Sequence, residues 1–182
     1  MNAELCTPSL HLRLLKRSDA KVIQKLVSDI RVSKYTTIPY PYPRNGAKDY
    51  LDIVAKQYEE RTSFTWAIEV VGEHHLIGCI GIGNDPVHLQ AEAGYWLSPD
   101  HWGKGYATEA LQAIIEFGVT ELRLNRISTG VFAGNEASVR VQEKCGLTLE
   151  GTLRQSYIKD GTPIDVTIRS ILRTEWEAKM LL

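Results

Sequence analysis

A glycine-rich turn, residues 102–107 (WGKGYA), constrains this chain more than any other feature of its sequence. Residues 91–97 before the turn have the pattern of a strand, and residues 108–122 after it repeat apolar side chains at the i, i+3, i+4 spacing of an amphipathic helix. A glycine-rich turn that leads into a helix directs free backbone N–H groups, and the positive end of the helix dipole, toward one point. The sequence therefore predicts an anion site here, most naturally for a phosphate or pyrophosphate group.

Three phosphate-binding patterns are similar to this turn, and two of them fail. A P-loop has its lysine after the second glycine, whereas Lys104 lies between the two glycines. A dinucleotide-binding turn needs a third glycine, where this chain has Thr108, and an acidic residue at the end of the next strand, which residues 126–132 lack. The third pattern ends in glycine, any residue, then glycine or alanine, and Gly105 and Ala107 satisfy it. A tight loop that only caps the helix is the structural alternative.

The composition predicts one soluble domain, residues 1–182, with a sizeable core, because 43% of the 182 residues are hydrophobic. The net charge of −1 gives no electrostatic reason to expect nucleic acid or an anionic membrane as a partner. The N-terminus lacks a signal-peptide pattern, and no apolar run approaches the ~20 residues of a membrane span. Cys6, Cys79 and Cys145 have no C-x-x-C spacing, so neither a disulfide framework nor a zinc site is indicated. We expect a cytoplasmic protein without a metal ion.

The periodicity of apolar residues predicts an α+β fold. Strand patterns cover residues 10–14, 64–71, 76–82, 91–97, 126–132, 148–157 and 166–172. About four helices are predicted: one capped by Ser18 that carries Ile30 on its apolar side, one from near Asn45, one after the glycine-rich turn, and a short one capped by Asn135. Three prolines within residues 38–43 exclude a helix or an inner strand there.

Several short stretches, which follow one another in the expected order and spacing, resemble the GNAT superfamily of N-acetyltransferases. Within it, they are most similar to the ribosomal-protein N-terminal (alanine/serine) acetyltransferases. The stretches are residues 92–97, 102–110, 135–138, 143–147 and 150–154, followed by Asp160 and Gly161. The third phosphate pattern is this superfamily's loop for the pyrophosphate of coenzyme A. The resemblance extends over nearly the whole chain. It implies a single GNAT-type domain, acetyl-CoA as the donor, and a mixed, mostly antiparallel, twisted sheet that splays between the strands ending at Leu97 and Phe132.

The resemblance also implies which residues bind the donor. A backbone N–H near Leu97 would polarise the thioester carbonyl, and the amides of residues 103–108 would bind the pyrophosphate. The positions that face the cofactor in the family correspond here to Leu97, Gly103, Lys104, Gly105, Tyr106, Ala107, Thr108, Asn135 and Ser138. Trp102 departs from the family pattern, because it lacks the side-chain donor of the usual glutamine or arginine. The phosphate site should therefore depend on main-chain amides and on Lys104.

Acetyl transfer from a thioester to an amine requires a bound acetyl group beside the amine, a proton acceptor, and stabilisation of the carbonyl oxygen. An α-amino group has a pKa of ~8 and a lysine ~10.4, so much of either is protonated at neutral pH. Glu92 is the first candidate for the base, because it lies on the strand before the turn, five residues before Leu97. A solvent-facing carboxylate without a role is the alternative for Glu92, and a chain of water molecules is an alternative route for the proton.

Ser138 is the second candidate catalytic residue. Asn135 is expected first as a helix N-cap, and Ser138 lies three residues on, at the same edge of the first helical turn. Many relatives place a tyrosine four residues after Ser138 as the acid for the departing thiolate, but this chain has Gln142 there. Either Ser138 assists the leaving group, directly or through water, or no acid is needed, because a thiol of pKa ~8.5 is a fair leaving group.

Other polar residues carry weaker indications. Cys145 is expected to be a core residue rather than a nucleophile. His74 and His75 belong to a predicted hairpin and are expected at the surface, whereas His88 is a candidate for the acceptor site and His101 for a cap beside the phosphate loop. Three tyrosines are candidates for the acceptor cleft or for packing at the domain edge: Tyr35, Tyr40 and Tyr42.

The sequence is compatible with more than one class of protein and with more than one kind of acceptor. An N-acetyltransferase is predicted; a non-catalytic acyl-CoA sensor or interaction module is the competing class, and a nucleotide-dependent oxidoreductase is the third. Calorimetric titration with coenzyme A, ATP and NAD separates these classes. The acceptor is a primary amine, with a protein N-terminus, a polyamine, an aminoglycoside and a free amino acid all open. A homodimer is compatible with the sequence.

Overall fold

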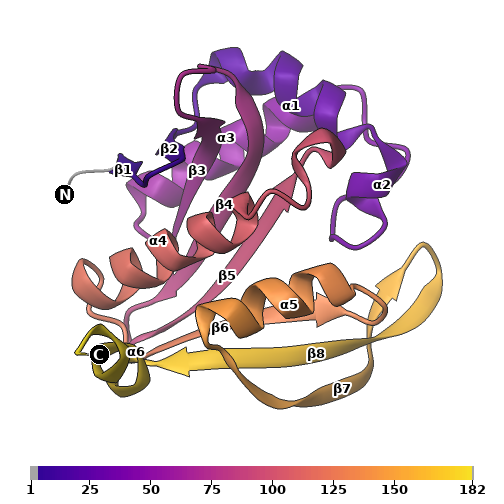
Figure 1. Ribbon diagram of the computed structural model, residues 1–182. Coiled ribbons are helices and arrows are strands. Elements are labelled where there is room, and N and C mark those ends of the chain that lie inside the picture. The colour runs from indigo at the N-terminus through magenta and orange to yellow at the C-terminus, as the bar shows by residue number, and fades with distance from the viewer. Residues whose placement is uncertain (1–3, 182) are drawn as a thin grey trace.

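Eight strands form one sheet in the order β1-β2-β3-β4-β5-β6-β8-β7. The computed structural model describes residues 4–181 of the chain (Figure 1). The strands are β1 (Leu5–Cys6), β2 (Leu10–Leu14), β3 (Ser63–Val70), β4 (Leu76–Asp85), β5 (Gln90–Leu97), β6 (Arg126–Phe132), β7 (Thr148–Lys159) and β8 (Thr162–Leu172). β5 and β6 are parallel, and every other neighbouring pair is antiparallel. The predicted mixed, mostly antiparallel sheet is confirmed.

Residues 4–181 contain six α-helices and two short 3-10 helices, η1 and η2. They are η1 (Arg17–Asp19), α1 (Ala20–Val27), α2 (Ile30–Ser33), α3 (Gly46–Glu59), η2 (Pro99–His101), α4 (Tyr106–Thr120), α5 (Glu136–Cys145) and α6 (Arg173–Met180). The sequence patterns did not predict α2 or α6. Residues 38–43 form neither helix nor strand, as their prolines predict. Within the described part of the chain, no helix is long and apolar enough to cross a membrane.

The first helix differs from its prediction at both ends. Ser18 lies within η1, and Asp19 rather than Ser18 occupies the N-cap position of α1. The helix ends at Val27, and Ile30 begins α2 with 56% of its surface exposed instead of lying on the apolar side of one longer helix. The cause is Asp29, whose side chain accepts a hydrogen bond from Arg31 N and so caps a new helix.

Helices cover both faces of the sheet (Figure 1). α1 and α3 pack on one face, around a core made of Ile23, Val27, Ala47, Leu51, Ala67, Leu76 and Cys79. α4 packs on the other face, where the rings of Phe117 and Trp66 lie 5.0 Å apart between centroids. α5 lies beside α4 on that side, next to β6 and β8 (Figure 1). The apolar stripe predicted for the long helix is confirmed, since its buried residues include Ala110, Leu111, Ile114, Ile115 and Gly118.

The sheet opens between β5 and β6. Their parallel register ends at the pair Glu92 and Ser128, although β5 continues to Leu97 and β6 to Phe132. The two strands therefore diverge beyond Glu92, and one edge of β5 is left without a neighbouring strand. The splay predicted between the strands that end at Leu97 and Phe132 is confirmed.

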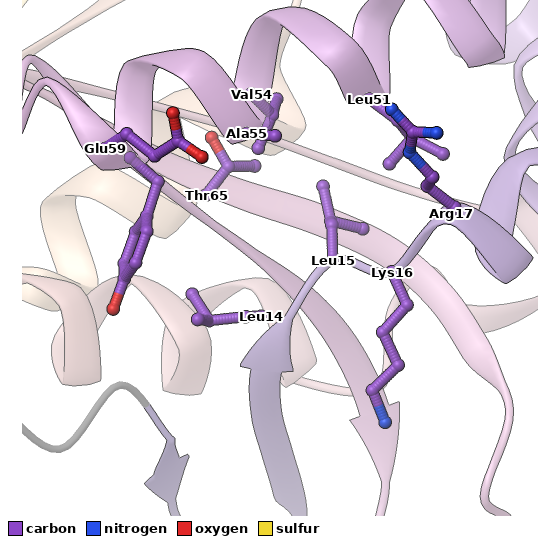
Figure 2. A pocket seen from close by; sticks show the side chains of 10 residues that line it. Leu14, Leu15, Lys16, Arg17, Leu51, Val54, Ala55, Glu59 and Thr65 are labelled. Carbon is purple, nitrogen blue, oxygen red and sulfur yellow. The ribbon is translucent and has the colours of Figure 1, made fainter.

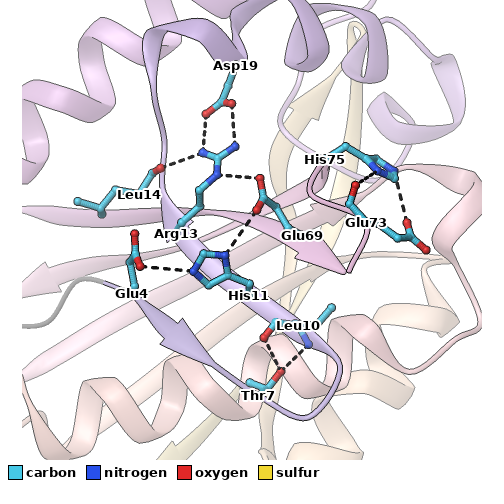
Figure 3. A network of polar contacts seen from close by, with 10 residues as sticks. All are labelled: Glu4, Thr7, Leu10, His11, Arg13, Leu14, Asp19, Glu69, Glu73 and His75. Carbon is cyan, nitrogen blue, oxygen red and sulfur yellow. Dashed lines mark hydrogen bonds and ion pairs between the residues drawn. The ribbon is translucent and has the colours of Figure 1, made fainter. Parts of the chain in front are cut away.

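A buried ion-pair network fixes η1 against β2 and β3 (Figure 3). Arg13 Nη1 lies 2.8 Å from Asp19 Oδ2, and Arg13 Nε lies 2.7 Å from Glu69 Oε1. Burial alone would raise the pKa of Asp19, but hydrogen bonds from Arg13 and from the Lys16 amide outweigh burial and lower that pKa. Removal of the Arg13 side chain would leave the buried carboxylate of Asp19 without its ion-pair partner, which is strongly destabilising.

Candidate active site

The glycine-rich turn has the conformation of an anion site. Gly103 and Gly105 have φ angles of +75° and +89°, which favour a residue without a Cβ. α4 begins at Tyr106, and Glu109 N donates to Gly105 O at 3.1 Å. The N–H groups of residues 106–108 precede this bond and have no intrahelical acceptor. A Cβ placed on either glycine would meet no atom within 4 Å, so the main chain is open to a bulky ligand.

Trp102 fastens this turn to the end of β5. Its indole Nε1–H donates to the Leu97 carbonyl oxygen at 2.8 Å. The sequence pattern identifies Trp102 only as the loss of a glutamine or arginine donor, because the bond depends on the turn folding back onto the strand. Lys104 lies exposed between the two glycines, where its charge favours an anion.

Leu97 presents a backbone N–H to the splay. Ser98 N donates to Ile77 O at 2.8 Å, which makes Gly78 and Leu97 a non-hydrogen-bonded pair of the β4–β5 ladder. The Leu97 N–H therefore points away from β4, toward the side from which β6 has diverged. This direction supports the prediction that Leu97 N contacts the acyl donor.

Alternation along β5 places two sets of side chains on opposite faces of the sheet. Tyr95 and Leu97 face the core under α4, whereas Trp96 packs with the core under α1 and α3. Glu92 and Gly94 share the face of Trp96. A Cβ added to Gly94 would meet no atom within 4 Å, so this face is open beside the splay.

The Glu92 carboxylate reaches over β6. Its Oε1 atom lies 3.8 Å from the position that a Cβ on Gly130 would occupy, and the residue is exposed. Within residues 4–181 the side chain has no hydrogen-bond or ion-pair partner. An unpaired carboxylate beside the splay is available to accept a proton from a bound amine, directly or through water.

Ser138 lies on the opposite face of β5 from this carboxylate, in the first turn of α5. Its Oγ atom is 2.8 Å from Tyr95 Oη. Asn135 Oδ1 accepts a hydrogen bond from Ser138 N at 3.2 Å, so the predicted N-cap is confirmed. Gln142 occupies the position where many relatives have a tyrosine, but Tyr95 brings a phenol hydroxyl to Ser138 from β5 instead.

Tyr95 is the site residue that sequence reasoning missed. Burial raises the pKa of Tyr95 to about 12, despite hydrogen bonds with Ser138 and Gln142 that lower it, so the phenol is neutral at physiological pH and can donate. Gln142 is fully buried, and its Nε2 donates to Thr129 Oγ1 at 3.3 Å. The only sequence signal for Tyr95 is its place two residues before Leu97. Its contact with Ser138 on α5 joins two distant parts of the chain and depends on how α5 packs against β5.

Aromatic side chains bound the face of the splay that carries Glu92. The rings of Phe132 on β6 and Tyr157 on β7 lie 4.8 Å apart between centroids. Tyr35 lies beside the β6–α5 turn. Its Cε1 atom is 3.8 Å from the position that a Cβ on Gly134 would occupy. These residues come from three separate segments and are the best candidates for contact with an acceptor.

The β7–β8 hairpin is hydrogen-bonded to the proline-rich residues 38–43, near these aromatic side chains. Lys159 Nζ donates to Ile38 O at 2.7 Å. Figure 1 shows the turn of this hairpin reaching toward the segment after α2.

Three other candidates for the acceptor site lie in different surroundings. Tyr42 packs against the core under α3, and Tyr40 is 46% exposed. His88 lies in the turn between β4 and β5, with its Nδ1 2.9 Å from Asp85 Oδ2. That turn precedes β5, whereas the splay opens toward the other end of the strand, at Leu97.

Cys145 belongs to the core, as predicted. It is 8% exposed, and its Sγ contacts Thr108 O at 3.5 Å. Burial raises the pKa of the Cys145 thiol to about 12, although Lys179 acts in the opposite direction. The thiol is therefore protonated at neutral pH and poorly suited to nucleophilic attack.

A pocket of about 200 Å³ lies apart from these groups, between α3 and the ends of β2 and β3 that face it (Figure 2). Its lining residues are Leu14, Leu15, Lys16, Arg17, Leu51, Val54, Ala55, Tyr58, Glu59 and Thr65. None of them belongs to the glycine-rich turn, to β5, β6 or α5. The pocket therefore contributes nothing to the candidate active site.

A free strand edge in a splayed sheet, next to a helix start with free backbone N–H groups, agrees with the class of acyl-coenzyme A-dependent transferases. Residues 9–148 match the family model described as "Acetyltransferase (GNAT) domain". This chain belongs to the GNAT family of acetyltransferases. The expected enzyme class is confirmed, in place of the sensor and oxidoreductase alternatives.

Similar proteins agree on the reaction and differ in the acceptors that their names give. YoaA of Bacillus subtilis (strain 168), named as an uncharacterized N-acetyltransferase, is 34% identical over 168 residues, which cover 92% of this chain and 95% of YoaA. YdaF of the same strain, which carries a provisional name as a ribosomal N-acetyltransferase, is 30% identical over 173 residues, covering 92% and 93% of the two chains. The structure of spermidine N-acetyltransferase from Vibrio cholerae with CoA and spermine is 25% identical, with a TM-score of 0.82 and coverage of 94% and 99%.

Proposed function

We propose that this protein transfers the acetyl group of acetyl-CoA directly to the α-amine of a polypeptide N-terminus, within a ternary complex. One arrangement carries the proposal. The unpaired carboxylate of Glu92 and the hydroxyl pair of Ser138 and Tyr95 lie on opposite faces of the strand whose edge the splay leaves free. A proton acceptor and a hydrogen-bonded hydroxyl pair are thereby available on the two sides of one reacting thioester.

The donor fits the glycine-rich turn and the free edge of β5. Its pyrophosphate would accept hydrogen bonds from the amides of residues 103–108, with Lys104 adding a positive charge. Its pantetheine arm would lie along the free edge of β5 with the thioester near Leu97 N, and Asn135 and Ser138 would face its thiol end. The complex of the similar Vibrio cholerae enzyme with CoA supports this choice of donor.

The transfer step uses these groups in order. The amine nitrogen attacks the thioester carbonyl carbon from the face of Glu92, which takes the amine proton directly or through a water molecule. The Leu97 N–H donates to the carbonyl oxygen as it becomes an oxyanion. The N–C bond forms, the C–S bond breaks, and the thiolate leaves toward Ser138, whose hydroxyl donates a hydrogen bond to it. Tyr95 positions the Ser138 hydroxyl, and the thiolate later takes a proton from solvent.

The charges and the chemistry of the open face favour an N-terminal α-amine over a polyamine. The candidate acceptor contacts combine the aromatic rings of Phe132, Tyr157 and Tyr35 with the cation of Lys159. The Lys159 Nζ atom lies 4.0 Å from Asp160 Oδ2. A polyamine carries several positive charges and would be repelled by Lys159. A peptide N-terminus presents a single amine, for which the one carboxylate of Glu92 is sufficient. An α-amine, with a pKa of ~8, also releases its proton to a carboxylate more easily than an alkylamine of ~10.4.

A panel of amines with acetyl-CoA tests the acceptor. We expect thiol release to be fastest, as kcat/KM, with peptides that begin with alanine or serine, and slower with spermidine, an aminoglycoside and free amino acids. The same peptides with a blocked N-terminus and an internal lysine are the control and should not react. Faster turnover of spermidine than of every peptide would contradict the proposed acceptor.

Ser138 and Tyr95 are expected to act as one unit. Ser138→Ala should slow transfer about 2–10-fold, because the departing sulfur, which carries only part of its negative charge in the transition state, loses one hydrogen bond worth ~0.5–1.5 kcal/mol. Tyr95→Phe should have an effect of similar size in the parent but almost none in the Ser138→Ala background. Single-turnover rates of the four proteins give this cycle. Fully additive effects would show that Tyr95 does not act through Ser138.

Cys145 is expected to carry no acetyl group during the reaction. Cys145→Ala should reduce the free energy of unfolding by about 1–3 kcal/mol and leave kcat nearly unchanged, because direct transfer needs no acyl-enzyme. Mass spectrometry of the parent mixed with acetyl-CoA alone should show no stoichiometric adduct. An adduct on Cys145 that amine discharges would establish a double-displacement route instead.

A further inference from the structure

We propose that Glu73, His75 and His101 form a binding site for one divalent transition-metal ion of the zinc class. The three side chains come from the β3–β4 turn and from η2, which are separate in sequence and adjacent in the fold. Each offers one ligand atom, and these atoms all lie within 4.8 Å of one another. Two imidazoles and one carboxylate form a ligand set that zinc proteins use together with a water molecule.

The distances are close to those of an ion-bound site. His75 Nε2 lies 3.5 Å from Glu73 Oε2, and His101 Nε2 lies 4.0 Å from the same oxygen. Tetrahedral bonds of 2.0–2.1 Å would separate the ligand atoms by about 3.4 Å. The distance from Glu73 to His75 matches this value, the distance from Glu73 to His101 exceeds it by about 0.6 Å, and the ligand atoms of His75 and His101 lie within 4.8 Å of each other.

The outer hydrogen bonds orient both imidazoles for metal binding. His75 Nδ1 lies 3.1 Å from the backbone oxygen of Glu73, which can only accept, so Nδ1 carries the proton and Nε2 keeps its lone pair (Figure 3). His101 Nδ1 lies 2.7 Å from Ser98 Oγ, which can accept the Nδ1–H when Nε2 binds a metal. Such partners on the second ring nitrogen are typical of histidine ligands.

The exposure of the three side chains suits an ion that arrives from solvent. The exposed fractions are 46% for Glu73, 55% for His75 and 16% for His101. A bound ion would join the β3–β4 turn to η2, which immediately precedes Trp102 and the glycine-rich turn. The search for a zinc site by cysteine spacing could not find this site, because its ligands are not cysteines. They also come together only after β4 and β5 pair.

Calorimetric titration of the tag-free, chelator-treated protein with ZnCl2 tests the site. We expect one ion per chain, and His75→Asn should weaken binding by about 100-fold or more, since loss of a ligand costs at least as much as loss of an outer-shell partner. His74→Asn is the matched control, because His74 is the neighbouring exposed histidine at φ +51°, a conformation that asparagine tolerates. It should bind Zn²⁺ like the parent.

Thermal unfolding gives a second measurement of the same binding. Zn²⁺ should raise the Tm of the parent and of His74→Asn but leave that of His75→Asn unchanged, because an ion that binds only the native state stabilises it. A parent that binds no Zn²⁺ would overturn the proposal. Equal affinities of the two histidine variants, or binding that disappears in Cys6→Ser, would also overturn it, since the ion would then lie elsewhere.

Discussion

Glutamine in place of Glu92 is expected to lower kcat by about 10²–10⁴-fold while acetyl-CoA binds as before, since this is the usual contribution of a general base. The amide keeps the size of the side chain but cannot take a proton from the attacking amine. Because the carboxylate has no partner among residues 4–181, the substitution breaks no contact of the described structure. Rates measured across pH should also lose their acidic limb, which reports protonation of the base.

A surface carboxylate provides the control for this result. Glu116 is exposed on α4, and Glu116→Gln makes the same chemical change away from the splay. Its rate and pH profile should equal those of the parent. An unchanged rate and an intact acidic limb in Glu92→Gln would make Glu92 a solvent-facing carboxylate and would leave the proton to a chain of water molecules.

Gly105→Val is expected to weaken coenzyme A binding by about 10²–10⁴-fold. The added side chain would occupy the open space over the turn, where the pyrophosphate approaches the main chain. Loss of two hydrogen bonds to a charged group, each worth ~1.5–3 kcal/mol, accounts for this range. Calorimetric titration with coenzyme A measures the dissociation constant directly.

The backbone strain of this substitution has a matched control. Gly161 in the β7–β8 turn has φ +80° and, like Gly105 at +89°, has no atom within 4 Å of an added Cβ. Gly161→Val should therefore lose a comparable ~1–3 kcal/mol of stability and still bind coenzyme A like the parent. If both valine variants bind coenzyme A normally while folded, the pyrophosphate does not lie on the glycine-rich turn.

Elements with short-range causes were predicted well from the sequence. β6 spans the predicted residues 126–132, and Asn135 caps α5 as expected. The first helix was wrong at both ends: it begins after η1, with Asp19 at its N-cap position, and it ends at Val27, because Asp29 caps a separate helix. Two short helices, α2 and α6, were missed, since elements of one or two turns carry little periodicity.

The candidate site divides in the same way. The glycine-rich turn was predicted, and its positive φ angles and free amides agree with an anion site. Glu92 was proposed from its place on the strand before the turn and Ser138 through the family resemblance, and their roles stay predictions for the experiments above. Tyr95 was missed, because the sequence shows Gln142 at the position of the usual acid but not the strand hydroxyl that reaches Ser138.

Local sequence patterns predicted the order of the main elements, the glycine-rich turn and the cap of α5. Each of these depends on residues within one strand, one turn or one helical end, where neighbours in sequence are neighbours in space. The tertiary fold sets which side chains meet across elements: Trp102 meets Leu97, Tyr95 meets Ser138, and Glu73 meets His101. These contacts depend on strand order, on the face that each strand turns to its neighbours and on the packing of helices against the sheet. No local pattern contains that information, because the partners are brought together only when the sheet forms.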